Sequence, residues 1–83
     1  MKVQIRYFAS IREAMGVASE VLETQAATLG ALRAELALRA GAGGEALKAD
    51  RPVRMALNQV IVSEDTELAP NSEVAFFPPV TGG

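Results

Sequence analysis

Apolar and polar residues alternate along the first segment of the chain, from Lys2 to Phe8. A period of two is typical of a β-strand with one buried face. A second strand is predicted from Ala18 to Thr24, and we expect it to pair with the first as a hairpin. In the first strand, one face carries Val3, Ile5 and Tyr7, and the other carries Gln4, Arg6 and Phe8.

Two helices are predicted. Ser10 is a suitable N-cap for a short helix over residues 11–15, and Gly16 can end it by adopting a positive φ angle. Thr28 is a good N-cap for the main helix, which we expect over residues 29–40. The buried stripe of this helix consists of Leu29, Leu32 and Leu36.

Glycines are expected to end the main helix. Gly41 takes the position after its last turn, and residues 41–44 are predicted to form a loop, followed by a helical turn over residues 45–49. The loop lacks the Lys-Ser/Thr of a phosphate-binding loop. Within the helix, Glu35 and Arg39 have the i,i+4 spacing of an ion pair, worth about 0.2–0.5 kcal/mol.

The second half of the chain predicts three short strands. Residues 54–57 and 60–62 flank a turn at Asn58-Gln59, and a turn at residues 70–72 precedes the last strand, residues 73–77. The side chains expected to face the core are Met55, Leu57, Val60, Val62, Val74 and Phe76, and those expected to face outward are Ile61, Ala75 and Phe77.

The order of elements predicts an α+β fold. One long helix can cover only one face of a sheet, which we expect to be the face of Val3, Ile5 and Tyr7. The arrangement that satisfies this is a β-grasp, or ubiquitin-like, roll with a mixed sheet of about five strands. Its first and last strands lie parallel at the centre. We expect one domain over residues 1–79 and a flexible tail over residues 80–83.

Composition excludes several classes of function. The 83 residues include no Cys and no His, which excludes thiolate catalysis, disulfides and the usual zinc ligands, so we expect no metal site and no catalyst acting alone. Ten acidic and eight basic residues give a net charge of −2, which argues against a nucleic-acid surface. No apolar run approaches the roughly 20 residues of a membrane span, and we see no leader segment, so the expected location is the cytoplasm.

Strand parity places Phe8, Ile61 and Phe77 on the face of the sheet that the helix leaves uncovered. Because the chain has only three Phe, two of them on an open face indicate a surface that a partner covers. The alternative is a shift of one strand by one residue, which would return one of these side chains to the core.

The last residues are suited to chemistry at the chain's own end. Pro78 and Pro79 cannot donate backbone hydrogen bonds, so they end the last strand and favour a stiff, extended exit. The four residues beyond them reach about 13–14 Å when extended, enough to thread into a narrow active site. A terminal carboxylate is ionised at neutral pH and must be activated, for example as an acyl-adenylate, and glycine leaves it unobstructed. These tail residues are Val80, Thr81, Gly82 and Gly83.

The ending of the chain, residues 73–83, closely resembles that of the small, sulfur-carrier subunits of molybdopterin synthase, with the sequence EVAFFPPVTGG. Residues 3–13 resemble the first strand and helix of that family, and residues 57–62 resemble its middle hairpin. The resemblance spans nearly the whole chain, although the main helix and the glycine-rich loop match only in pattern.

The resemblance implies that an ATP-dependent adenylyltransferase, related to ubiquitin-activating enzymes, adenylates Gly83, and that sulfur from a donor protein converts it to a thiocarboxylate. The tail would then enter the large subunit of a heterotetramer and give its sulfur to cyclic pyranopterin monophosphate, forming the molybdopterin dithiolene. In that family no cofactor is bound permanently, the catalytic side chains lie in the large subunit, and the positions matching Phe8, Ile61 and Phe77 contact partners. Arg6 departs from the apolar residue expected there, which could narrow the patch or alter the choice of partner.

Three other functions stay open at this point. A sulfur carrier of thiazole synthesis shares the terminal glycines but lacks the Phe-Phe-Pro-Pro run. A ubiquitin-like modifier joined to lysines uses the same activation, and intact mass separates it from a sulfur carrier. A plain interaction module with an inert tail predicts that removing Gly83 has no effect.

Overall fold

The computed structural model describes residues 1–79, and its strands lie within one residue of the predicted bounds. The main helix is shorter than predicted, and a further helix follows it. The elements are β1 (Lys2–Tyr7), α1 (Ala9–Met15), β2 (Ser19–Glu23), α2 (Leu29–Ala37), α3 (Ala42–Ala46), β3 (Arg54–Leu57), β4 (Val60–Val62) and β5 (Glu73–Phe77).

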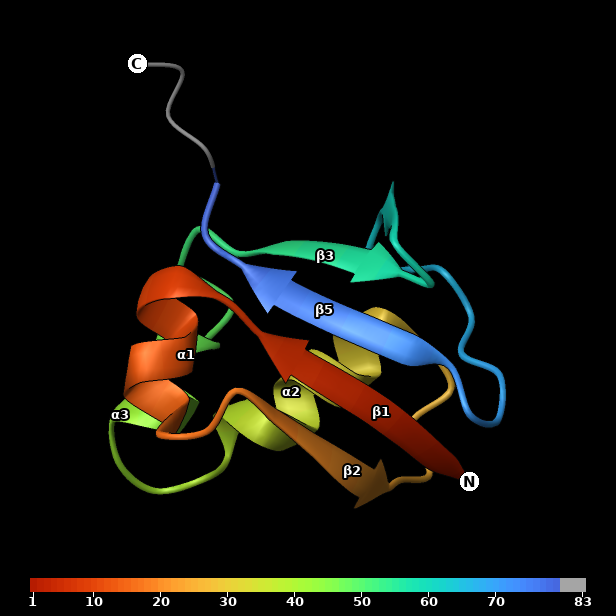
Figure 1. Ribbon diagram of the computed structural model, residues 1–83, viewed down its shortest axis with the longest axis horizontal. Coiled ribbons are helices and arrows are strands. Elements are labelled where there is room, and N and C mark those ends of the chain that lie inside the picture. The colour runs from red at the N-terminus through yellow and green to blue at the C-terminus, as the bar shows by residue number, and fades with distance from the viewer. Residues whose placement is uncertain (80–83) are drawn as a thin grey trace.

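The strands form one five-stranded mixed sheet in the order β2-β1-β5-β3-β4. β1 and β5 are parallel and central, and the other pairs are antiparallel. Figure 1 shows these two strands side by side and pointing the same way, with α2 behind them. This topology is the predicted β-grasp roll, and it leaves the face opposite α2 without a helix.

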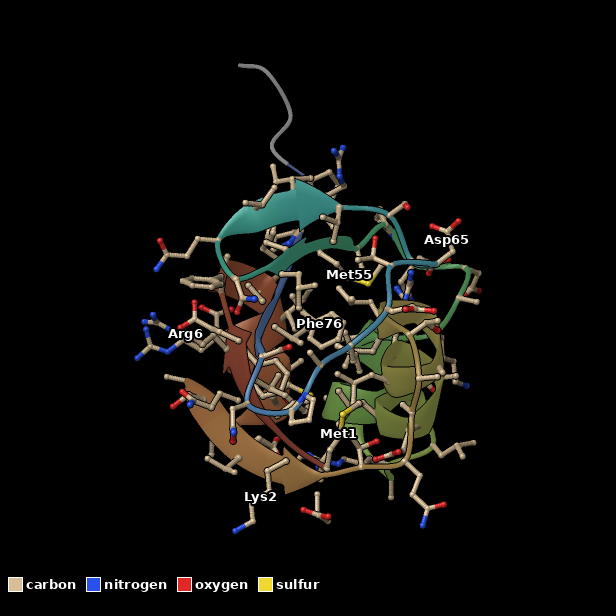
Figure 2. All side chains as sticks on the ribbon, turned by 90° about the vertical axis from the view of Figure 1, so that its right-hand side faces the viewer. Met1, Lys2, Arg6, Met55, Asp65 and Phe76 are labelled. Carbon is tan, nitrogen blue, oxygen red and sulfur yellow. The ribbon has the colours of Figure 1, made fainter. Side chains whose placement is uncertain are left out.

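The core lies between the sheet and the helices. Figure 2 shows Phe76 and Met55 pointing into this space, while Arg6 points the opposite way. The rings of Tyr7 and Phe76, from adjacent strands, stack with centroids 6.2 Å apart. The buried cluster consists of Val3, Ile5, Tyr7, Ile11, Leu29, Leu32, Leu36, Leu47, Met55, Val74 and Phe76, which includes the stripe predicted for the main helix.

Local signals in the sequence set several of the turns. Gly16 ends α1 with φ 80°, and the Thr28 hydroxyl caps α2 by accepting from the N–H of Ala31 at 3.1 Å. Asn58 and Gln59 both have positive φ, 49° and 71°, as a type I′ hairpin turn requires. These predictions are confirmed.

The predicted start of α1 is wrong. Ser10 lies inside the helix, and Phe8 is the N-cap, in an extended conformation and without a side-chain cap. The N–H of Phe8 donates to the carbonyl of Phe76 at 3.1 Å, and the carbonyl of Phe8 accepts from the N–H of Arg12 at 3.2 Å. Pairing with β5 therefore holds Phe8 at the strand end, and the helix begins directly after it.

The predicted end of α2 is also wrong, because the helix stops at Ala37 rather than at residue 40. Gly41 is the N-cap of α3, with φ 90°, and the segment predicted as a loop over residues 41–44 joins this helix. Gly44 is buried, and a Cβ there would collide with the carbonyl of Arg39. Glycine is needed because α3 approaches the backbone after α2 so closely.

Arg39 does not pair with Glu35, as the helical spacing predicted. It lies beyond the end of α2 and forms a bidentate pair with Glu20 on β2, with both N–O distances 2.8 Å. Glu35 instead accepts from the Thr24 hydroxyl at 2.7 Å. The hydrogen bonds from Arg39 lower the pKa of Glu20. Burial, followed by the hydrogen bond to Glu20, raises the pKa of Tyr7.

Arg33 is a buried cation on α2 that the sequence reading did not single out. Its Nε donates to the carbonyl of Leu47 at 2.8 Å, and its Nη2 donates to the carbonyls of Lys48 and Arg51 at 2.6 and 2.8 Å. Its Nη1 contacts Glu64 at 3.1 Å. Arg33 therefore ties α2 both to the segment before β3 and to the loop after β4.

Candidate functional site

The open face of the sheet carries two phenylalanines at the end where β1 and β5 finish. β1 and β5 pair Tyr7 with Phe76, so one more residue along this register brings Phe8 beside Phe77. Both rings point away from the core side, because Tyr7 and Phe76 alternate with them and are buried. Phe8 is 42% exposed, so a large part of its ring is open to solvent.

Ile61 lies on the same face, two strands away from β5. The register pairs Ala75 of β5 with Ala56 of β3, and Ala56 with Ile61 of β4. Ile61 is 59% exposed, whereas Ala56 is buried although no helix covers it. The surface between Ile61 and β1 is therefore formed by the small side chains of Ala56 and Ala75. We call the three large apolar residues Phe8, Ile61 and Phe77 the open-face patch.

The predicted parity of these strands is thus confirmed. Val60 pairs with Leu57 and lies on the same side of β4 as Val62, as predicted, but it is 62% exposed rather than buried, because β4 is an edge strand. That the open-face patch contacts a partner stays a prediction.

Two features of the open face were missed in the sequence. Val21 on β2 is 66% exposed and pairs with Gln4, which places it on this face. The alternation of side chains along residues 19–23 could have predicted that Val21 lies on this face. The guanidinium of Arg6 lies 5.6 Å from the centroid of the Phe8 ring, within cation–π range. The spacing of Arg6 and Phe8 in the sequence does not by itself predict this contact.

The chain leaves the sheet next to the open-face patch. β5 ends at Phe77, as the two prolines predicted, and Pro78 and Pro79 are half-buried. The tail residues Val80, Thr81, Gly82 and Gly83 lie outside the described residues, so their predicted role is untested. Pro78 and Pro79 directly follow Phe77, so the last described residues lie next to the open-face patch.

Residues 1–79 hold no cluster of three or more His, Cys, Asp or Glu side chains that could bind a metal ion. In the same range, no helix is long and apolar enough to cross a membrane. The geometry thus offers a surface for contact and an exit for the chain's end.

Comparison with known proteins agrees with this geometry. The sequence profile of the ThiS family matches residues 5–83. The chain belongs to the ThiS family. It is 38% identical to the molybdopterin synthase sulfur carrier subunit of Escherichia coli and 36% identical to that of Haemophilus influenzae, in each case over 98% of this chain and 99% of the relative. The family resemblance found in the sequence is therefore confirmed.

A solved structure extends the likeness of this ThiS-family chain to three dimensions. This protein is similar to a chain in the protein–protein complex of subunits 1 and 2 of molybdopterin-converting factor from Helicobacter pylori. The identity is 29%, the TM-score is 0.67, and all of both chains is covered. The ubiquitin-like β-grasp fold is thus shared with a protein that was solved together with a second subunit.

Proposed function

We propose that this protein is the sulfur-carrier subunit of a molybdopterin synthase, and that its C-terminal Gly83 carries the sulfur as a thiocarboxylate. The observation that carries the proposal is similarity over nearly the full length to carriers of that name, at 36–38% identity. The tail through Gly83 lies within the segment that matches the ThiS family profile.

The chemistry proposed for Gly83 has two steps. In the first, the terminal carboxylate attacks the α-phosphorus of ATP on an adenylyltransferase, and pyrophosphate leaves. In the second, sulfur supplied by a donor protein at the oxidation level of sulfide attacks the carbonyl of the acyl-adenylate and displaces AMP, which leaves a thiocarboxylate with no net oxidation or reduction. Gly82 keeps the backbone around the reacting carbonyl free of side chains, so that both partners can approach it.

The large synthase subunit is the proposed partner for sulfur delivery. The open-face patch would dock on it, and Pro78 and Pro79 would direct Val80 and Thr81 toward its active site. The sulfur would pass to cyclic pyranopterin monophosphate to build the molybdopterin dithiolene. The chain itself has no His or Cys, so the catalytic side chains are expected in the large subunit of a two-plus-two heterotetramer.

The test is reconstitution with a molybdopterin synthase large subunit, an adenylyltransferase, ATP and a sulfur donor, with the intact mass of the carrier recorded at each stage. The proposal expects a gain equal to sulfur replacing one oxygen, which disappears when the pterin precursor is added and dithiolene forms. Large adducts on lysines would instead support a protein modifier. Transfer only to a thiazole precursor would support the other sulfur-carrier pathway.

A further inference from the structure

Arg6 lies inside the contact surface rather than at its border. The register runs across the open face from Arg6 through Ala75 and Ala56 to Ile61. Phe8 and Phe77 form the next row toward the strand ends, so a protein that covers the open-face patch also covers Arg6. In Figure 2, Arg6 points away from the helices and into solvent.

The position of the Arg6 side chain is set by two neighbours. Its guanidinium lies 5.6 Å from the centroid of the Phe8 ring, and one of its nitrogens lies 4.0 Å from a carboxylate oxygen of Glu73. A guanidinium has five N–H donors. The Glu73 contact, at the outer limit of an ion pair, engages at most a small part of them, and the Arg6 side chain is 51% exposed. Most of its donors therefore bind water in the isolated protein.

Covering the open-face patch removes that water. Burying a charge without a hydrogen-bonding partner costs much free energy. Glu73 cannot replace the lost water, because its contact leaves most N–H donors of Arg6 without an acceptor. We propose that the large-subunit surface that docks on this face carries a carboxylate opposite Arg6. This inference rests on the proposed function, because it takes the large subunit as the partner. It makes Arg6 a specificity residue, since a partner without that carboxylate would bury an unpaired guanidinium.

The reasoning that predicts a partner carboxylate opposite Arg6 does not extend to Arg54. It is exposed and pairs with Phe77 across β3 and β5, so it also lies on the open face. It lines an open groove together with Glu64 and Asp65, so the chain itself places two carboxylates in the groove that Arg54 lines. A partner need not supply one there.

The experiment measures binding of the large subunit by Arg6→Leu, Arg6→Glu and the control Lys2→Glu. Lys2 lies on the same strand and the same face as Arg6, about 13 Å away, and Lys2→Glu makes the same charge change as Arg6→Glu. We expect the dissociation constant to rise at least about 30-fold for Arg6→Leu and further for Arg6→Glu. We expect Lys2→Glu to stay within about twofold of the wild type, because surface charges at that distance are largely screened. Circular dichroism melts establish that each variant is folded.

The sign of the Arg6→Leu effect decides the question. Leucine enlarges the apolar surface, so binding as tight as the wild type, or tighter, would overturn the proposed carboxylate. If binding weakens, replacing the facing acid of the large subunit with Lys should restore the affinity of Arg6→Glu. If no such replacement at any acid of the interface restores that affinity, the proposed carboxylate is also overturned. Absence of binding by the wild-type carrier is a different result, which would refute the proposed function itself.

Discussion

Replacing Arg33 by Met should destabilise the fold more than any other single loss of charge that we can identify in residues 1–79. Met keeps most of the length of the side chain but removes all its donors. Four hydrogen bonds disappear, to Glu64 and to the carbonyls of Leu47, Lys48 and Arg51. The bond to Leu47 is buried, so that carbonyl is left without its partner.

The magnitude follows from these contacts. A hydrogen bond to a charged group contributes about 1.5–3 kcal/mol when buried, and the bonds that reach solvent contribute much less. We therefore expect a loss of about 2–4 kcal/mol, against a total of roughly 4–12 kcal/mol for a domain of this length. In a domain this small, each kcal/mol lowers Tm by about 4–8 °C, so Tm should fall by roughly 8–32 °C.

Urea and thermal unfolding followed by far-ultraviolet circular dichroism measure this loss. Arg51→Met is the matched control, because Arg51 is exposed and only its backbone carbonyl, which the substitution keeps, accepts from Arg33. The control should change stability by less than about 0.5 kcal/mol. If Arg33→Met costs no more than Arg51→Met, the network around Arg33 does not hold α2 to its neighbours.

Three further predictions concern the open face, the tail and pH. Phe77→Asp should weaken large-subunit binding by more than about 2 kcal/mol, as loss of a buried anchor does, whereas Val21→Asp on the same face should not; equal effects in calorimetry would contradict the placement of the site. Gly82→Ala should leave the melting curve unchanged but slow thiocarboxylate formation, and a normal rate by mass spectrometry would argue against threading. The raised pKa of Tyr7 means that its neutral form is favoured by folding, so stability from this group is complete below about pH 10 and declines as pH rises above it. Tyr7→Phe should flatten that alkaline decline, and an equally steep decline in urea titrations would show that Tyr7 is not its source.

The sequence was sufficient for the sheet because its signals are local. The alternation in β1, the Asn58-Gln59 turn and the Thr28 cap each act within a few residues, and the predicted parity of Phe8 and Phe77 followed from them. The errors arose where distant segments compete with local spacing. Arg39 reaches Glu20 on β2 instead of its helical neighbour.

Other features of the fold depend on contacts that no single segment encodes. Gly44 belongs to a helix because α3 packs against the carbonyl of Arg39, a contact with no signature in the glycine-rich run itself. Arg33 is buried because four acceptors from two other segments, the one before β3 and the loop after β4, converge on it. The ring contact of Arg6 with Phe8 likewise depends on side-chain conformations that the sequence leaves open.

Whether Gly83 carries the sulfur can be read from the intact mass of the carrier after incubation with an adenylyltransferase, ATP and a sulfur donor. The expected shift equals the exchange of one oxygen for sulfur, which fragmentation assigns to residue 83 and which a chain lacking Gly83 does not show. A carrier that supports dithiolene synthesis while its mass never changes, or while the added sulfur sits elsewhere in the chain, would refute a thiocarboxylate at Gly83.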